Sequence, residues 1–253
     1  MKIFLGGALG RMGREVTAAA AEAQVEIVCG VDVAYTGQPS DYPIVTAFDQ
    51  ATQKADVLID FSRPSALPEL LQLVRKEKMP AVLCTTGYNE AELQMIEEAS
   101  REIPVFRSAN MSLGVNVLRH LVQEAARALG EDFDVEIVER HHRMKADSPS
   151  GTALMLYDSV KEATETLRQP VFGRYGRTAQ RQPGEVGIHA VRGGTITGEH
   201  EVCFYGDGEE LILTHRAEKR SLFARGALRA AAFLMDKPAG KYDMQDLIEE
   251  MLR

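Results

Sequence analysis

The chain has 253 residues, of which 45% are hydrophobic and 26% charged, and its formal net charge is −8. This composition is typical of a globular protein with one large or two small domains, and the charge argues against nucleic acid or an anionic membrane as partner. No apolar run approaches the ~20 residues of a membrane-spanning helix, and the one at the start is too short for a signal peptide. Cys29, Cys84 and Cys203 lie far apart without zinc or disulfide spacing, so we expect a cytoplasmic protein.

Strand and helix patterns alternate over the first part of the chain. Apolar runs cover residues 2–5, 25–31, 57–61, 81–84 and 105–106, and helical patterns cover 14–23, 65–76 and 89–101, the last with capping-box spacing between Asn89 and Glu92. Continuous apolar runs are typical of strands buried on both faces, so the alternation predicts a parallel sheet with helices on both sides. We expect residues 1–112 to form a Rossmann-like α/β domain that binds a dinucleotide.

The pattern changes after Asn116. Helices are predicted over residues 117–128 and 152–167 and strands over 135–139, 186–191, 201–205 and 210–214, with an exposed loop over 173–184 and a hairpin turn at Asp207-Gly208. This order predicts a smaller α+β domain with an open mixed sheet over residues 113–220. Helices over 222–234 and from Met244 are expected to pack on the first domain, so that residues 221–253 complete it.

A glycine-rich turn follows the first expected strand. Gly7, Gly10 and Gly13 form a GxxGxxG variant of the dinucleotide fingerprint, in which glycines let the backbone approach a pyrophosphate. A purely structural turn is the alternative. The position of Asp32, at the end of the second strand, favours nucleotide binding because an acid there holds a ribose hydroxyl. The expected cofactor contacts are Gly7, Ala8, Leu9, Gly10, Arg11, Met12 and Asp32.

The charge of Asp32 also bears on the choice of cofactor. Its carboxylate should accept a hydrogen bond from a ribose hydroxyl and repel a 2′-phosphate, so we expect NADH to be favoured over NADPH. Arg11 or Arg14 would weaken that preference.

Two more loops follow expected strands at their carboxyl ends, where open α/β sheets bind ligands. One is Cys84-Thr85-Thr86 and the other is Ser108-Ala109-Asn110-Met111. Their threonine and asparagine side chains suit a nicotinamide amide. Ordinary connecting loops with capping residues are the other interpretation, and the residues alone favour it.

A charged stretch with two adjacent histidines, His141 and His142, invites a metal-site interpretation. Neighbouring residues of a strand point to opposite faces, however, and no set of Cys, His or Asp ligands accompanies the pair. We therefore expect no metal. A solvated basic loop is a second interpretation of the same residues.

The third interpretation of this stretch is catalytic. One histidine would donate a proton, since histidine titrates near neutral pH. Lys145 would donate a proton as well or polarise the bound ligand. The segment Ser150-Gly151-Thr152 can open a helix and grip a carboxylate with N–H and hydroxyl donors. We favour this interpretation, which predicts a site that binds an acid and moves a proton.

The sequence resembles the bacterial dihydrodipicolinate reductase family, also named 4-hydroxy-tetrahydrodipicolinate reductase. The resemblance extends along essentially the whole chain. Its motifs are residues 7–13, 60–62, 85–87, 110–112, 114–116, 139–152, 192–193, 198–200 and 223–227. The run His-His-Arg-x-Lys-x-Asp-x-Pro-Ser-Gly-Thr within residues 139–152 is highly specific to the family.

The resemblance implies a function and roles for single residues. The family reduces a cyclic dicarboxylate with NADH or NADPH to tetrahydrodipicolinate, in lysine and diaminopimelate biosynthesis. It implies that His141 and Lys145 are the proton-transfer pair, that His142 contacts substrate, and that Gly151 and Thr152 bind a substrate carboxylate. The implied cofactor contacts include Cys84, Thr85, Thr86, Ser108, Ala109, Asn110 and Met111. A homotetramer assembled through the sheet of the second domain is also implied.

The sequence departs from the family pattern at Met144, Cys84 and Met111, where many members have histidine, glycine and phenylalanine. None of the three belongs to the proton-transfer pair. Two rival functions remain: another two-domain NAD(P)-dependent oxidoreductase, such as an amino-acid or sugar dehydrogenase, and a non-catalytic NAD-sensing protein. Neither would need the charged stretch.

Overall fold

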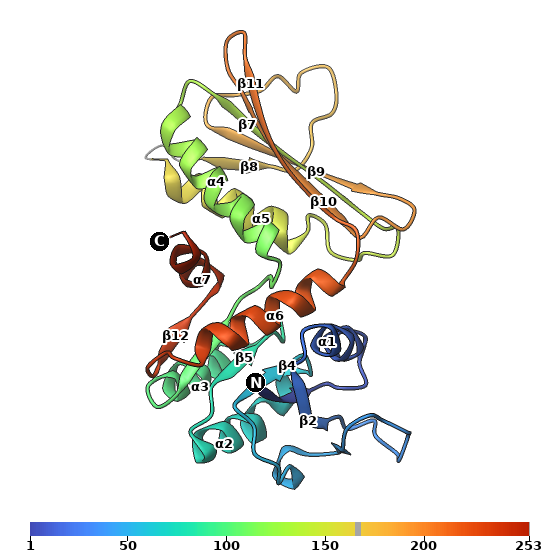
Figure 1. Cartoon of the computed structure of the whole chain (residues 1–253). Helices are drawn as coiled ribbons and strands as arrows, with labels where there is room; N and C mark the ends of the chain where they lie inside the picture. Colours follow the sequence, from blue (N-terminus) through green and yellow to red (C-terminus); the bar gives the residue numbers. More distant parts are fainter. Residues whose placement is uncertain (165–167, 253) are drawn as a thin grey trace. The chain divides into compact units, whose positions relative to one another are not determined.

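The computed structural model describes residues 1–164 and 168–252. Contacts within the chain divide it into two compact units. Unit 1 contains Met1–Leu113 and Arg220–Arg253, and unit 2 contains Gly114–Lys219. The chain therefore leaves unit 1 once and returns to it, and each unit has its own sheet (Figure 1).

In the described part of unit 1, seven strands form a parallel sheet in the order β12-β6-β5-β4-β1-β2-β3. The strands are β1 (Lys2–Gly6), β2 (Glu26–Val31), β3 (Ile44–Val45), β4 (Val57–Asp60), β5 (Ala81–Leu83), β6 (Pro104–Arg107) and β12 (Gly240–Tyr242). The strand order reverses between β1 and β4. Parallel α/β sheets bind ligands beside the carboxyl ends of the strands at such a reversal.

Helices cover both faces of this sheet, as the alternating pattern predicts (Figure 1). They are α1 (Arg11–Glu22), α2 (Leu67–Glu77), α3 (Glu90–Ser100), α6 (Ser221–Leu234) and α7 (Met244–Met251), with short 3₁₀ turns η1 (Phe48–Gln50) and η2 (Pro64–Ala66). One core joins α1, α6 and α7 to one face, and a second joins α2 and α3 to the other. The capping box predicted at Asn89 is present at the start of α3.

Unit 2 is an α+β unit with a mixed sheet, ordered β11-β10-β7-β9-β8 in its described residues. Its strands are β7 (Asp134–His141), β8 (Gln169–Val171), β9 (Glu185–Arg192), β10 (Gly198–Tyr205) and β11 (Glu210–Ala217), and its helices are α4 (Leu113–Leu129) and α5 (Gly151–Ala163). β10 pairs antiparallel with β7 and β11, whereas β7 and β9 are parallel. Apolar side chains of α4 and α5 pack on one sheet face. The predicted fold class is confirmed.

Several predicted boundaries were wrong. Helix α1 begins at Arg11 rather than residue 14, because the turn ends at Gly10. Helix α4 begins at Leu113 rather than residue 117, and its buried face already includes Val115. Strand β7 continues past residue 139 because His141 pairs with β9. Helix α5 ends at Ala163, and residues 165–167 of the helix predicted there lie outside the described residues.

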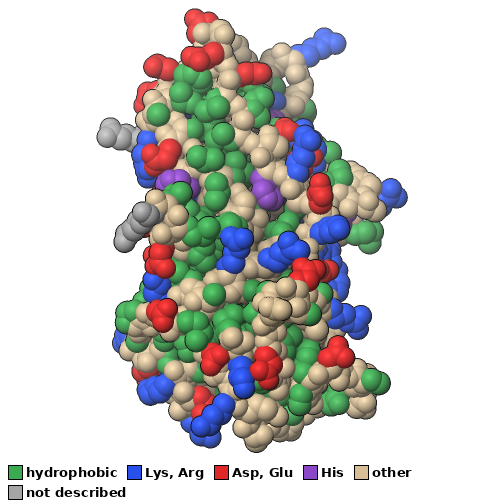
Figure 2. Space-filling view, in the orientation of Figure 1, with side chains coloured by type: hydrophobic (Ala, Val, Ile, Leu, Met, Phe, Trp, Pro, Cys, Tyr) green, Lys and Arg blue, Asp and Glu red, His purple; other side chains and the backbone are tan. Residues whose placement is uncertain are grey.

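Other differences concern edge elements and the loop before β9. Strands β3, β8 and β12 are too short to leave a pattern in the sequence, and each is held by backbone pairing with a neighbour. The loop over 173–184 is not wholly exposed, because Arg174 and Arg181 are ion-paired with Glu136. No helix in residues 1–164 and 168–252 is long and apolar enough to cross a membrane. Acidic and basic side chains are interspersed on the face drawn in Figure 2.

Candidate active site

The glycine turn brings the start of α1 close to the sheet of unit 1. Gly7 has a φ of 73°, which favours glycine. A Cβ on Gly13 would lie 2.2 Å from the carbonyl oxygen of Gly7, so only glycine allows this approach. Gly10 is the N-cap of α1 and offers no side-chain acceptor, which leaves the helix start suited to an anion. The turn therefore has the geometry that a pyrophosphate needs.

Asp32 lies directly after β2, and its carboxylate is held by the backbone. Oδ2 accepts from the N–H of Leu9 at 2.9 Å and Oδ1 from the N–H of Ala34 at 2.9 Å. Asp32 thus links the glycine turn to the end of β2. It lines a cavity together with Gly7, Gly10 and Arg63. The expected acid and the expected turn meet at one site.

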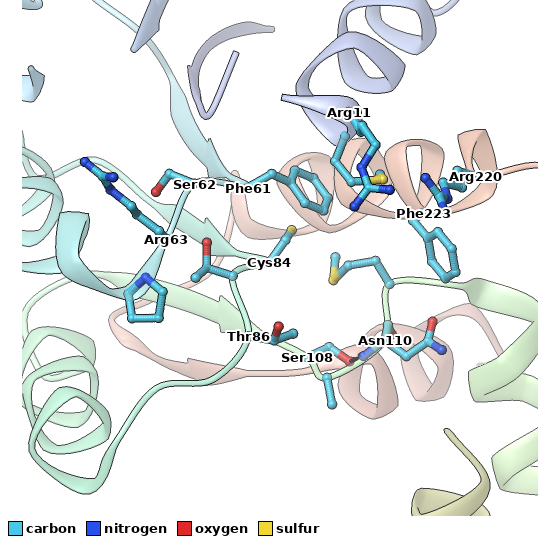
Figure 3. A pocket seen from close by; sticks show the side chains of 15 residues that line it. Arg11, Phe61, Ser62, Arg63, Cys84, Thr86, Ser108, Asn110, Arg220 and Phe223 are labelled. Carbon is cyan, nitrogen blue, oxygen red and sulfur yellow. Dashed lines mark hydrogen bonds between the residues drawn. The ribbon is translucent and has the colours of Figure 1, made fainter. Parts of the chain in front are cut away.

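A second cavity of about 510 Å³, within the size range of small-molecule sites, lies at the carboxyl ends of the unit 1 strands. Figure 3 shows that side chains from the turn and both predicted loops line it. The predicted residues in this lining are Arg11, Met12, Cys84, Thr85, Thr86, Ser108, Ala109, Asn110 and Met111. Ala8 and Leu9 line a different cavity, which α1 and residues 39–44 also line.

The cavity of about 510 Å³ is also lined by residues that the sequence did not single out as cofactor contacts. They are Phe61, Ser62, Arg63, Pro64, Arg220 and Phe223. Arg220 and Phe223 come from the start of α6, more than a hundred residues along the chain. Arg11 and Arg220 add two guanidinium groups to the lining, which suits a diphosphate. The signal that could have found Phe223 is the family motif over residues 223–227.

Buried Asp60 supports the two inner loops of this cavity. Thr85 donates its hydroxyl to Asp60 Oδ2 at 2.7 Å, and the N–H of Ser62 donates to Oδ1 at 3.2 Å. Burial raises the pKa of Asp60, although the hydrogen bonds from these neutral donors act to lower it. Because the Thr85 hydroxyl is engaged in this way, the exposed Thr86 is the better placed of the two to face a ligand. Cys84 is buried, and burial raises the pKa of its thiol, so it is not a reactive cysteine.

Met111 is one of the departures from the family pattern, and it is buried at 4% exposure. A Cβ on Gly226 would lie 1.7 Å from the carbonyl oxygen of Met111, so helix α6 meets this loop at a glycine. Met111 therefore belongs to the packing of α6 as well as to the cavity lining. Met144, by contrast, is 81% exposed.

The charged stretch of unit 2 is at the end of β7 and the start of α5. His141 is the last residue of β7 and is buried, and burial lowers its pKa despite the opposing effect of Glu139. His142 follows, and its N–H donates to the carbonyl oxygen of Ile196 at 2.8 Å. Lys145 Nζ lies 2.9 Å from Asp147 Oδ1. His141 is thus buried at the end of β7, whereas His142 lies just beyond the strand and is half-buried.

Helix α5 begins where the sequence predicted a carboxylate-binding helix start. Ser150 is its N-cap, and its Oγ accepts from the N–H of Ala153 at 3.1 Å. Gly151 and Thr152 form the first turn, with Gly151 exposed. Ser150 Oγ is also 2.9 Å from His200 Nε2, and burial lowers the pKa of His200 to about 3. The neutral ring of His200 therefore contacts Ser150 at the start of α5.

Three side chains of this region were missed as site residues, although each lies in a motif quoted from the sequence. Glu139, Arg192 and His200 surround His141 and Ser150 on three adjacent strands. Arg192 and His200 lie 53 and 61 residues after Glu139, so no local pattern joins them to it.

Family models identify the chain. The model described as dihydrodipicolinate reductase, N-terminus, matches residues 1–111, and the one described as dihydrodipicolinate reductase, C-terminus, matches residues 114–248. The chain belongs to the dihydrodipicolinate reductase family. Members of this family are NAD(P)H-dependent reductases. A relative named 4-hydroxy-tetrahydrodipicolinate reductase, from Caldanaerobacter subterraneus subsp. tengcongensis, is 49% identical over 251 residues and covers 99% of each chain.

Solved structures show the same fold. Dipicolinate-bound dihydrodipicolinate reductase from Paenisporosarcina sp. TG-14 matches with a TM-score of 0.78 at 22% identity, over 96% of this chain and 97% of that one. Scyllo-inositol dehydrogenase from Lactobacillus casei matches with a TM-score of 0.58 at 12% identity, over 100% and 89%. Because a sugar-alcohol dehydrogenase has this fold too, the fold alone does not separate the reductase family from rival oxidoreductases.

Proposed function

We propose that this chain reduces 4-hydroxy-tetrahydrodipicolinate, a cyclic dicarboxylate, to tetrahydrodipicolinate in lysine and diaminopimelate biosynthesis. The observation that carries the proposal is the match along 99% of the chain to a relative of that name. Bound NADH or NADPH supplies a hydride. The substrate takes up this hydride and one proton and loses its hydroxyl as water, so the reaction balances with release of the oxidised cofactor.

Unit 1 is proposed to bind the cofactor. The close approach at Gly7 and Gly13 and the start of α1 suit its pyrophosphate, and Arg11 and Arg220 add positive charge. The cavity lined by residues 84–86 and 108–111 suits the nicotinamide end. For the ribose, Asp32 offers a carboxylate that would be repelled by a 2′-phosphate. We therefore propose NADH as the preferred cofactor.

Unit 2 is proposed to bind the substrate and move the proton. Lys145 and His142 would neutralise substrate carboxylates, and the start of α5 at Ser150-Gly151-Thr152 would bind one of them with N–H and hydroxyl donors. His141 is proposed as the proton donor and acceptor, with Lys145 as the second proton donor. The lowered pKa of His141 leaves its ring neutral near pH 7 until an anion binds nearby. A dianionic substrate would raise that pKa and load the ring with a proton.

We propose a homotetramer that assembles through the sheet of unit 2. The face of this sheet opposite α4 and α5 carries exposed apolar side chains, Val191 at 45%, Ile212 at 45% and Tyr205 at 41%. They alternate along their strands with the residues that face the helices. Exposed apolar groups on one sheet face are typical of a protein interface.

A cytoplasmic location is also part of the proposal. All three cysteines are buried free thiols, which suits a reducing compartment. The reaction also consumes a reduced nicotinamide cofactor. Fractionation of the source cells with an antibody against the chain would test this, and recovery in a secreted fraction would contradict it.

The decisive experiment follows NADH absorbance with purified protein and enzymatically generated substrate. We expect rapid NADH oxidation that depends on both protein and substrate. Amino acids, sugars and inositols serve as comparison substrates, because a rival dehydrogenase would act on one of them instead. Tight NADH binding without turnover of any substrate would indicate an NAD-sensing protein. Either result would overturn the proposed function.

A further inference from the structure

Glu139 is a completely buried carboxylate in unit 2 that receives four hydrogen bonds. Its Oε2 is 2.6 Å from His141 Nδ1 and 2.7 Å from Arg192 Nη1. Its Oε1 accepts from Arg192 Nη2 at 2.7 Å and from the N–H of Ser150 at 2.9 Å. Its exposure is 0%. One carboxylate therefore joins the proposed proton donor to the first residue of the proposed carboxylate-binding helix start.

The sheet places Glu139, His141 and Arg192, whereas Ser150 comes from the start of α5. Glu139 and His141 lie two residues apart on β7 and share a face. Arg192, on β9, pairs with His141, and His200, on β10, pairs with Glu139. Arg192 grips both oxygens of Glu139 and also donates to the carbonyl oxygen of Asp147 at 2.7 Å. A bidentate guanidinium of this kind allows the carboxylate little freedom to rotate.

The ionised state of Glu139 follows from its partners. Burial opposes ionisation, but the hydrogen bonds from Arg192, His141 and Ser150 together hold the pKa of Glu139 below its usual range. An ionised carboxylate can only accept, so Nδ1 of His141 must carry the hydrogen that they share. The other ring nitrogen, Nε2, is then the one that exchanges a proton with a substrate.

Gly198 leaves room at that second nitrogen. A Cβ at position 198 would lie 3.0 Å from His141 Nε2, closer than ordinary packing. His200 also lies beside the ring, with centroids 5.1 Å apart, and is itself held by Ser150. The ring of His141 is thus fixed on the Nδ1 side and left uncrowded on the Nε2 side.

We propose that Glu139, held by Arg192, is a positioning residue for the reduction: it sets the tautomer of His141 and aligns that ring with the start of α5. This inference rests on the proposed function for its kinetic consequences. Proton transfer needs the acid and the bound substrate to be aligned within about 1 Å, because a misplacement of that size costs ~10²-fold in rate. A shared carboxylate meets this need, since the ring and the helix start cannot shift independently.

The competing explanation is a buried ion pair that serves only stability. Such pairs can be replaced without loss of a unique fold, so burial and short distances do not decide the question. Strand β7 offers a matched comparison on its opposite face. Glu136 accepts from His189 Nε2 at 2.7 Å and from Arg174 at 2.7 Å, and also from Arg181. It has the same kinds of partner but no proposed part in proton transfer.

The first test compares Glu139→Gln with Glu136→Gln, each checked for oligomeric state. In Glu139→Gln an amide NH₂ replaces one oxygen and must face Arg192 or His141. At least one hydrogen bond that Glu139 accepts is then lost. We expect kcat to fall about 10²-fold or more and the KM for substrate to rise, with NADH affinity unchanged because unit 1 is untouched. Glu139→Asp should recover part of kcat. For Glu136→Gln we expect a similar loss of stability and a kcat near wild type.

The second test needs no turnover, and its deciding spectrum is that of the wild-type protein. Nitrogen NMR of the histidine side chains, assigned with His141→Gln, reports which ring nitrogen carries the hydrogen. We expect the wild-type ring to carry it on Nδ1, and Glu139→Gln to move part of it to Nε2. A wild-type ring protonated on Nε2 overturns the proposal, as does an unchanged kcat in Glu139→Gln. If the wild type reduces no substrate, the proposed function fails and this spectrum still tests the tautomer.

Discussion

Two buried carboxylates, Asp60 and Glu139, show how neighbours decide the state of an acid. Burial acts on both in the same direction and favours the neutral form. Asp60 receives neutral donors from Thr85 and Ser62, and its pKa stays raised. The guanidinium of Arg192 reverses the balance at Glu139. Asp60 is therefore suited to holding loops in place, and Glu139 is suited to orienting the ring of His141, which changes charge.

Lys145 is the residue whose loss should harm turnover without harming cofactor binding. Lys145→Ala removes a positive donor from the proposed substrate site, and we expect kcat to fall ~10²–10⁴-fold while NADH affinity stays near wild type. Steady-state kinetics and NADH titration measure both. Lys161→Ala, at an exposed position on α5, is the control for charge. Normal turnover in Lys145→Ala would contradict its assigned role.

Asp32 is the residue proposed to favour NADH. In Asp32→Ala the ribose loses its acceptor and the repulsion of a 2′-phosphate disappears, so kcat/KM for NADH should fall and the ratio of NADPH to NADH use should rise. Removal of the carboxylate also frees the N–H groups of Leu9 and Ala34, which weakens binding of both cofactors. The exposed Asp49 is the charge control as Asp49→Ala. An unchanged cofactor ratio would argue against the ribose contact.

His200 should make the protein sensitive to acid. Its pKa is lowered to about 3 by burial, below its usual 6.5. The folded chain keeps this ring neutral while the unfolded chain takes up a proton, so stability is present above pH 6.5 and is lost as pH falls towards 3. The loss is about 1.4 kcal/mol per pH unit, or about 2 kcal/mol between pH 6.5 and pH 5.

The acid effect of His200 is measured by urea unfolding at pH 7 and pH 5. His200→Gln should lose less stability between the two pH values than the wild type. Acidic groups such as Glu139 contribute to both proteins alike, so the difference isolates His200. Equal pH dependence in the two proteins would mean that His200 is protonated in the folded chain.

At the scale of elements, two helix starts with similar caps have different proposed tasks. Asn89 caps α3 in unit 1, and Ser150 caps α5 in unit 2. The cap at Asn89 was predicted from its spacing to Glu92, since a cap and its partner lie within one turn, and the segment Ser150-Gly151-Thr152 was expected to open a helix. Only the α5 start adjoins the charged stretch.

Ser150→Ala and Asn89→Ala should therefore separate stability from substrate binding. Each loses a cap worth about 1 kcal/mol. We expect both to lower the melting temperature, but only Ser150→Ala to raise the KM for substrate, because it also removes the contact with His200. Thermal unfolding and steady-state kinetics give the two readouts. A raised KM in Asn89→Ala as well would trace the effect to general destabilisation.

At the scale of the whole molecule, the proposed tetramer depends on the open face of the unit 2 sheet. Ile212→Lys and Val191→Lys place charges on that face without touching the core under α4 and α5. We expect light scattering to report a smaller particle for both variants, because a buried unpaired charge opposes association. Met251→Lys, at an exposed position of α7 in unit 1, is the control. Wild-type mass in the two sheet variants would exclude this face as the interface.

The sequence by itself determined the features that depend on neighbouring residues. The alternation of strands and helices, the turn at Gly7 and Gly13 and the helix start at Ser150 are all local patterns, and the structure contains each of them. Element ends were less predictable because pairing with another strand, as at His141, sets where a strand stops. Resemblance to the family then supplied the substrate, which no local pattern encodes.

Only the tertiary structure decided which distant residues meet. Strand order and register bring Arg192, 53 residues away, onto both oxygens of Glu139, and the return of the chain brings Arg220 to the cavity beside Arg11. The physical reason is that a contact across a sheet depends on which strands are neighbours and in what register, and a sequence records only order along the chain. The charged stretch could thus be recognised from its residues, but the contacts of Glu139 that orient His141 could not.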